Sequence, residues 1–206
     1  MFAANSKQYK IGSYTTSEKE IKDLTLAWVM LSLAFAIALG GGFSFTIEFL
    51  ITWFISAVTV GTGFICHELG HKITAQRFGC FAEFRASFTM LLLAVAMSFT
   101  GIIFAAPGAV MISGYVNNIT NGKISASGPI VNIILAAMFL FLSFFISIAG
   151  VMGMIIKYGY LINTWLALFN MIPVGILDGA KVLKWNKNVY GGIVAVGVVF
   201  LLFGGV

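Results

Sequence analysis

Charged side chains are scarce in this 206-residue sequence: they make up 9% of it, against 60% hydrophobic residues, and the mean hydropathy is +1.01. So little charge leaves too little polar surface to enclose a water-soluble globule. A chain of this length holds five or six helical spans of about 20 apolar residues each. We therefore expect one α-helical, polytopic integral membrane domain, residues 1–206, with the lipid bilayer as its surroundings.

Cysteine pairs and basic clusters are lacking too, which excludes two further classes of protein. Cys66 and Cys80 are the only cysteines and have no CxxC spacing, so neither a disulfide framework nor a two-thiol metal site is indicated. The 12 Lys and Arg residues are scattered through short connections rather than gathered on one face with aromatic residues. Nucleic acid is therefore not an expected partner, despite the net charge of +5.

Apolar runs separated by polar or Gly-rich breaks organise the chain. Residues 1–23 are mostly polar, do not read as a cleavable signal peptide, and are predicted to be a cytoplasmic tail. A first span, 24–41, ends at three consecutive glycines, and a second covers 45–78. After a mixed region, 80–127, the remainder, 128–206, holds further spans at Pro129–Ile148, Tyr158–Ile172 and Tyr190–Phe203. Proline at the first helical position favours a helix that begins there.

The apolar stretch Phe88–Pro107 is long enough to cross a bilayer, but the distribution of basic residues argues against a crossing. A crossing would divide the 12 basic residues eight against four between the two faces. If the stretch enters and leaves by the same face, the division becomes eleven against one, which the positive-inside tendency favours. We predict a re-entrant segment that packs near a polar cavity, with the N-terminus and the active site facing the cytoplasm.

Three short segments have the alternation or length of strands. They are Phe81–Ser87, Ala109–Tyr115 and Lys123–Ser127. Asparagine and glycine residues between the last two supply the composition of a turn. A small membrane-associated β-sheet is therefore predicted beside the re-entrant segment.

The clearest chemical signal is the pattern HELGH at the end of the second span. His67 and His71 are four residues apart, so on a helix both imidazoles face one side and can reach one metal ion. Glu68 is rotated by roughly a quarter turn, close enough to address a metal-bound water without being a ligand. Because ionisable groups in a membrane helix are costly, these residues are expected to be functional.

A catalytic zinc ion takes three protein ligands, and the chain has no third histidine. Three of the acids lie in the tail, and Glu48 is roughly 28 Å from His67 at the helical rise of 1.5 Å per residue. Glu83 lies two positions before Arg85 in a strand pattern, so both side chains share one face. An ion pair with Arg85 is the ordinary explanation for this carboxylate. Asp178 follows the fourth span in an apolar, uncharged setting, so Asp178 is the favoured third ligand and Glu83 the alternative.

Three motifs, taken in this order, resemble the site-2 protease family of intramembrane zinc metalloproteases. They are HELGH at 67–71, SGPIVN at 127–132 and NMIPVGILDG at 170–179, and together they span more than half of the chain. The resemblance implies Zn²⁺ held by His67, His71 and Asp178, with Glu68 as the catalytic base. It also implies transmembrane proteins as substrates, cleaved in regulated intramembrane proteolysis.

Asn170 and Asn132 are implied by the same resemblance to help hold the substrate peptide. Interhelical hydrogen bonds within the bundle are the other explanation for both residues. Two other functions remain open: a membrane zinc peptidase that uses Glu83 as its third ligand, and a non-enzymatic metal transporter. The sequence does not indicate an oligomeric state.

Overall fold

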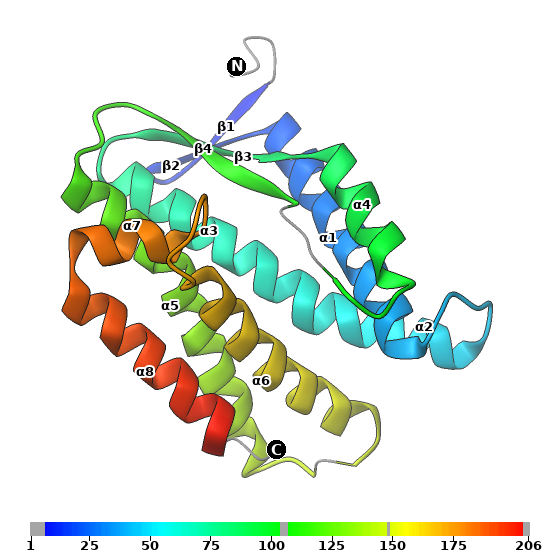
Figure 1. The fold of residues 1–206 in the computed structure, drawn as a ribbon. Coiled ribbons are helices and arrows are strands. Elements are labelled where there is room, and N and C mark those ends of the chain that lie inside the picture. The colour runs from blue at the N-terminus through cyan, green and yellow to red at the C-terminus, as the bar shows by residue number, and fades with distance from the viewer. Residues whose placement is uncertain (1–6, 104–106, 148, 204–206) are drawn as a thin grey trace.

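Helices make up most of the protein in the computed structural model, which describes residues 7–103, 107–147 and 149–203. Figure 1 shows the arrangement. The elements in chain order are β1 (Gln8–Ile11), β2 (Tyr14–Ser17), α1 (Glu18–Gly40), α2 (Ile47–Ser56), a π-helical turn (Ala57–Gly61), α3 (Thr62–Arg77), β3 (Phe81–Ala86), α4 (Phe88–Ser98), β4 (Gly108–Ser113), α5 (Asn118–Ser143), α6 (Gly150–Asn170), α7 (Asp178–Trp185) and α8 (Lys187–Phe203).

Four helices among the described residues are long and apolar enough to cross a membrane. They are α1, α5, α6 and the continuous helix Ile47–Arg77 that α2, the π-helical turn and α3 form together. The remaining apolar helices, α4 and α8, are shorter. The structure thus agrees with a polytopic helical membrane protein, while the fifth and sixth spans stay predictions.

The N-terminal boundary of the first span differs from the expected one. Residues 8–17 form an antiparallel hairpin of β1 and β2, and α1 begins at Glu18 rather than at Leu24. The helix begins there because the Ser17 side chain accepts a hydrogen bond from the Glu20 backbone N–H at 3.1 Å. Residues 1–6 of the predicted tail lie outside the described part of the chain.

Helix α5 corrects two predictions. Lys123–Ser127 is not a strand, and Pro129 does not open the helix, because both lie within α5. The helix starts at Asn118, where the Asn117 side chain accepts a hydrogen bond from the Thr120 N–H at 2.8 Å. Pro129 therefore lies well inside a helix and deprives the Ser125 carbonyl of its usual intrahelical donor. Asparagine here acts as a helix cap rather than as a turn residue.

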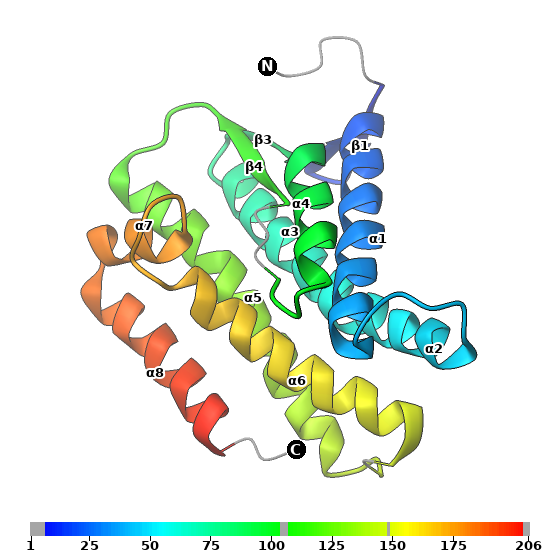
Figure 2. The ribbon, with the colours of Figure 1, turned by 45° about the vertical axis from the view of Figure 1, so that its right-hand side comes forward.

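The two strands predicted on either side of the re-entrant segment are present. Strands β3 and β4 pair antiparallel, with Phe84 opposite Val110. The Ser87 N–H donates to the Pro107 carbonyl at 2.8 Å, so the chain leaves β3, forms α4 and returns to the point where it left. Residues 104–106 lie outside the described residues. Figure 2 shows α4 beside α1, with the two strands above.

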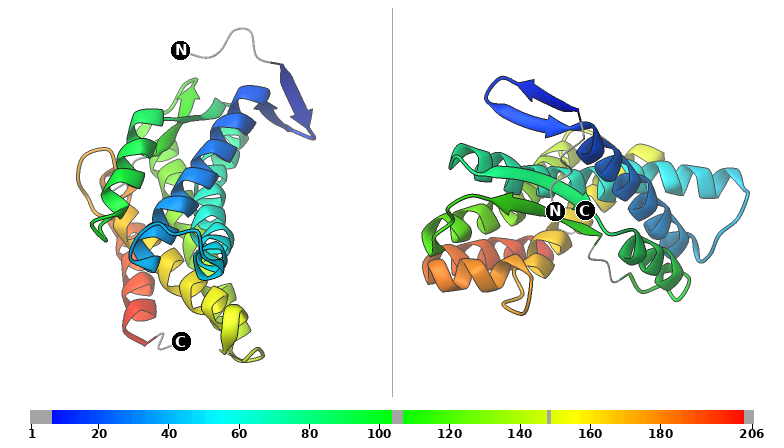
Figure 3. Two further views of the ribbon diagram at one scale, coloured as in Figure 1. Left: turned by 90° about the vertical axis from the view of Figure 1, so that its right-hand side faces the viewer. Right: turned by 90° about the horizontal axis from the view of Figure 1, so that it is seen from above.

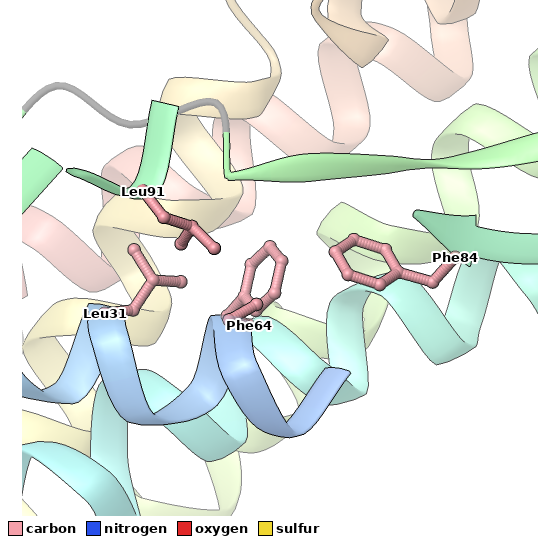
Figure 4. Close-up of a cluster of buried hydrophobic side chains, with 5 residues drawn as sticks. Leu31, Phe64, Phe84 and Leu91 are labelled. Atoms are coloured by element: carbon pink, nitrogen blue, oxygen red, sulfur yellow. The ribbon is translucent and has the colours of Figure 1, made fainter. Parts of the chain in front are cut away.

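Side chains from four elements pack β3 and α4 against the helices α1 and α3. Leu31 of α1, Phe64 of α3, Phe84 of β3 and Leu91 of α4 are buried in one cluster with Ala27 (Figure 4). The rings of Phe64 and Phe84 meet edge to face with centroids 5.7 Å apart. The cluster fixes β3, and with it β4, beside the part of α3 that carries the HELGH motif.

The ends of the elements gather into two groups. Strands β3 and β4, the end of α3, the start of α5 and helix α7 lie at one end of the molecule, while the connection from α5 to α6 lies at the other (Figures 1 and 3). Trp185 of α7 packs directly against Gly122 near the start of α5. The segments that carry Lys123 and Lys181 are therefore at the same end.

Candidate metal centre

Helix α3 brings His67, Glu68 and His71 into the interior around its middle. All three side chains are buried. The two imidazoles lie one turn apart on one face of the helix, and their Nε2 atoms are 3.0 Å from each other. Both rings therefore present a nitrogen to the same small volume, as the spacing predicts.

Asp178, the first residue of α7, brings a carboxylate to the same place. Its Oδ2 atom lies 3.0 Å from Nε2 of His71 and 3.4 Å from Nε2 of His67. Burial alone would raise the pKa of Asp178, but His71 and His67 together hold that pKa below its ordinary value. The favoured form is the carboxylate, which is the form that binds a metal.

These three residues form the one group of histidine, cysteine and acidic side chains, among the described residues, that is placed to hold a metal ion. Their donor atoms lie within 4.8 Å of one another. Two imidazole nitrogens and one carboxylate oxygen are a donor set of catalytic zinc, which keeps its fourth position open. The residues therefore fit zinc.

The far side of each imidazole ring is held by an oxygen atom. Nδ1 of His71 lies 2.8 Å from the carbonyl oxygen of Ile124, and Nδ1 of His67 lies 2.6 Å from Oδ1 of Asn132. A backbone carbonyl only accepts, so Nδ1 of His71 carries the hydrogen and its Nε2 offers a lone pair. Such outer hydrogen bonds orient metal-binding histidines.

Gly128 leaves the space in front of the imidazoles free. A Cβ atom at this position would lie 2.5 Å from Nε2 of His71 and 2.6 Å from Nε2 of His67. Gly70, between the two histidines in sequence, lets α5 approach: a Cβ there would lie 3.2 Å from the carbonyl oxygen of Ser127. The motif and α5 are thus packed backbone to backbone at the site.

A cavity of about 370 Å³ opens onto the three ligands. Its wall combines the metal ligands and Glu68 with three other groups of residues. These are the start of β4 (Pro107, Gly108, Ala109, Val110 and Ile112), residues of α5 and α6 (Asn121, Ile124, Ser125, Leu166, Phe169 and Asn170), and Phe64, Ile176, Leu177 and Lys181.

The remaining predicted residues fall into different surroundings. Asn170 lines the cavity, and its amide nitrogen donates to the Leu166 carbonyl at 2.9 Å. Asn132 is fully buried and lies outside the cavity wall, with His67 as its neighbour. Glu83 is paired with Arg85 and is not part of the metal-binding group. The structure therefore brings Asp178, rather than Glu83, to the two histidines.

Two features of the site have no counterpart in the sequence reasoning. Asn163 of α6 is fully buried and hydrogen-bonded to Asn132 at 2.9 Å. Lys72, directly after the motif, forms a buried ion pair with Glu20 of α1. Glu20 belongs to the segment that was predicted to be a cytoplasmic tail, so a pairing with Lys72 was not expected from the sequence.

Comparison with curated proteins finds the "Putative zinc metalloprotease MJ0611" of Methanocaldococcus jannaschii. The two sequences are 39% identical over 176 residues, which cover 84% of this chain and 88% of that protein. No family model matches the chain, and no solved structure matches it.

Proposed function

We propose that this chain, which belongs to the zinc metalloprotease family of its archaeal relative, cleaves peptide bonds within or near transmembrane segments of membrane proteins. We assign it, with the site-2 proteases, to regulated intramembrane proteolysis. The observation that carries the proposal is the position of the metal centre. His67 and His71 are buried within the candidate span Ile47–Arg77, and Asp178, which follows the candidate span Gly150–Asn170, meets them there, with Glu68 in the same cavity wall.

The chemistry divides between zinc and Glu68. When bound, zinc supplies a Lewis acid that acidifies water and polarises a peptide carbonyl. Glu68 follows His67 in α3 and faces the same cavity without being one of the three ligands. Its carboxylate accepts the proton of the attacking water and then donates it to the leaving amine, as a general base and acid does.

The outer edge of β4, which pairs with no further strand among the described residues and whose Val110 N–H donates to the Glu68 carboxylate, supports binding of the substrate as an extended strand. The backbone N–H groups of Phe84 and Ala86 point away from β4, donating to Glu20 at 2.9 Å and to Asp23 at 3.4 Å. In an antiparallel ladder, the residues opposite them then direct their own N–H and C=O groups outward. These residues, Val110 and Gly108, line the cavity.

A strand laid against β4 would therefore run along the cavity, with its backbone hydrogen-bonded beside the metal ligands. This matters because the backbone of a helical substrate is already hydrogen-bonded internally and is closed to attack. We assign Asn170, which lines the same cavity, to substrate binding. The mostly apolar wall suits the side chains of a membrane-spanning segment.

The charge distribution supports a site that faces the cytoplasm. Eleven of the 12 basic residues belong to segments at the end of the molecule that holds the metal centre. They are Lys7, Lys10, Lys19, Lys22, Lys72, Arg77, Arg85, Lys123, Lys181, Lys184 and Lys187. Under the positive-inside tendency this end, with the N-terminus, is cytoplasmic. The excursion through α4 is then re-entrant, since it starts and ends at that side.

The test is cleavage of a model transmembrane substrate by the purified protein in detergent or liposomes, beside Glu68→Gln. We expect zinc content to be unchanged in the variant and cleavage to fall by about 10²–10⁴-fold or more, the contribution of general acid–base catalysis. Cleavage of soluble peptides but not of the transmembrane substrate would contradict the intramembrane assignment. Zinc transport that survives Glu68→Gln, without any cleavage, would identify a transporter instead.

A further inference from the structure

Two buried asparagines connect the helix that carries His67 to the two helices behind it. Asn132 of α5 and Asn163 of α6 are both 0% exposed, and neither lines the cavity. Burying an amide costs free energy unless its hydrogen bonds are made. Each asparagine therefore has to be understood from the groups to which it bonds.

The orientation of the pair is set by two backbone carbonyls, which can only accept hydrogen bonds. Nδ2 of Asn163 donates to the Gly159 carbonyl at 2.8 Å, so Oδ1 of Asn163 faces Asn132. Nδ2 of Asn132 then donates both of its hydrogens, to Oδ1 of Asn163 at 2.9 Å and to the Gly63 carbonyl at 3.1 Å. Turning either amide over would place oxygen atoms against each other.

One oxygen remains, and it faces a zinc ligand. Oδ1 of Asn132 lies 2.6 Å from Nδ1 of His67. Since this oxygen only accepts, Nδ1 of His67 must carry the hydrogen. The lone pair then lies on Nε2, which is the atom that faces His71 and Asp178. The tautomer of His67 is thus fixed through a chain of hydrogen bonds that begins at Gly159.

We propose that Asn132 and Asn163 are positioning residues for zinc: together they fix the tautomer and the ring plane of His67. Asn163 acts through Asn132 and holds α6 in register with α5 and α3. This assigns Asn132 to the ligand rather than to the substrate. The proposal rests on the zinc site but concerns metal affinity. It can therefore fail while the protease assignment stands, and the protease assignment can fail while this proposal stands.

The experiment measures zinc affinity of the full-length protein in detergent by competition with a chelator, and the visible spectrum of the Co²⁺-substituted protein. We expect Asn132→Leu to weaken zinc binding by about 10–100-fold, the usual cost of losing such an outer partner. Asn163→Leu should weaken it measurably but less, by up to about tenfold, because Asn132 keeps its bond to Gly63. Both should alter the cobalt spectrum.

Thr164→Val is the matched control. Thr164 is the next residue of α6, is equally buried, and its hydroxyl donates to the Tyr160 carbonyl of its own helix, at 2.9 Å. We expect its zinc affinity and cobalt spectrum to match those of the unmodified protein. An equal loss of affinity in Thr164→Val and Asn163→Leu would overturn the proposal, since it would show a general packing effect.

Two further variants separate positioning from folding. Asn132→Asp keeps an acceptor for Nδ1 of His67, so it should bind zinc more tightly than Asn132→Leu. The double variant Asn132→Leu with Asn163→Leu should bind zinc no more weakly than Asn132→Leu alone, because the second residue acts through the first. Additive losses in the double variant, or unchanged affinity in Asn163→Leu, would contradict the chain of bonds.

Discussion

The two histidines of the candidate zinc site lie one turn apart on one helix, yet they are held in different ways. His67, the histidine farther from the C-terminal end of α3 and so at the inner position, is hydrogen-bonded by a side chain, Asn132. Asn132 is itself hydrogen-bonded by Asn163 on a third helix. His71, nearer the end of α3, is held by the backbone carbonyl of Ile124. The side-chain partner of His67 can be removed by substitution, whereas the backbone partner of His71 depends on the path of α5.

That path is set by small residues and by charge. Gly128 and Gly70 let α5 and α3 approach closely at the ligands. Beyond His71, the buried pair of Lys72 with Glu20 ties the same end of α3 to α1. The outer half of the site is thus fixed by main-chain packing and an ion pair, and the inner half by amide hydrogen bonds. Each kind of support predicts a different response to substitution.

The largest effect is expected where main-chain packing is broken. Gly128→Ala would place a methyl group 2.5–2.6 Å from both ligand nitrogens, so stoichiometric zinc binding should be lost. Gly70→Ala is the matched change: its nearest neighbours would be 3.1 Å and 3.2 Å away and need to move only slightly. Metal analysis of the purified variants measures this. Full zinc occupancy in Gly128→Ala would show that zinc binding does not require a residue without a side chain at this position.

The second effect concerns the ion pair at the outer half. Lys72→Met leaves the carboxylate of Glu20 buried without its cation, which typically costs about 3–5 kcal/mol in the free energy of unfolding. Phe84 N–H and the Thr16 hydroxyl still donate to Glu20, so the protein should fold but unfold at lower denaturant concentration.

Lys22→Met is the control for that change. Lys22 pairs with Glu18 on the exposed surface of α1, where ion pairs contribute little. We expect its unfolding curve to match that of the unmodified protein. If Lys72→Met and Lys22→Met behave alike, the buried pair does not stabilise the outer half of the site.

The smallest effect is expected from crowding the inner support. Gly63→Ala would place a Cβ atom 2.7 Å from Oδ1 of Asn163, the acceptor on which Asn132 depends. Zinc affinity should fall by less than the roughly tenfold expected for losing an outer partner, because the asparagine can shift. Chelator competition measures this. A loss as large as that in Gly128→Ala would show that the two halves are not supported separately.

Local patterns in the sequence predicted much of the site. The spacing of His67 and His71 follows from helical geometry, and Asp178 was the favoured acid because other carboxylates were too far away or had ordinary explanations. Strands β3 and β4 were also predicted, while the re-entrant course of the chain between them stays a prediction. These are properties of short segments or of charge balance along the chain.

What the sequence did not predict depends on contacts between distant segments. Glu20 reaches Lys72, and Asn163 reaches Asn132, only once the helices have packed. The extra turns at the start of α5 were missed because Asn117 serves as a cap, and Pro129 is tolerated inside a helix that is packed on both sides. A single sequence carries no local signal for such pairings.

The most direct test of the account is the zinc content of two variants that undergo the same chemical change. Asp178→Asn and Glu83→Gln each replace a buried carboxylate with its amide. If His67, His71 and Asp178 hold the metal, the purified protein carries one zinc ion per chain, Glu83→Gln keeps it, and Asp178→Asn loses it. Zinc retained in Asp178→Asn and lost in Glu83→Gln would contradict the account.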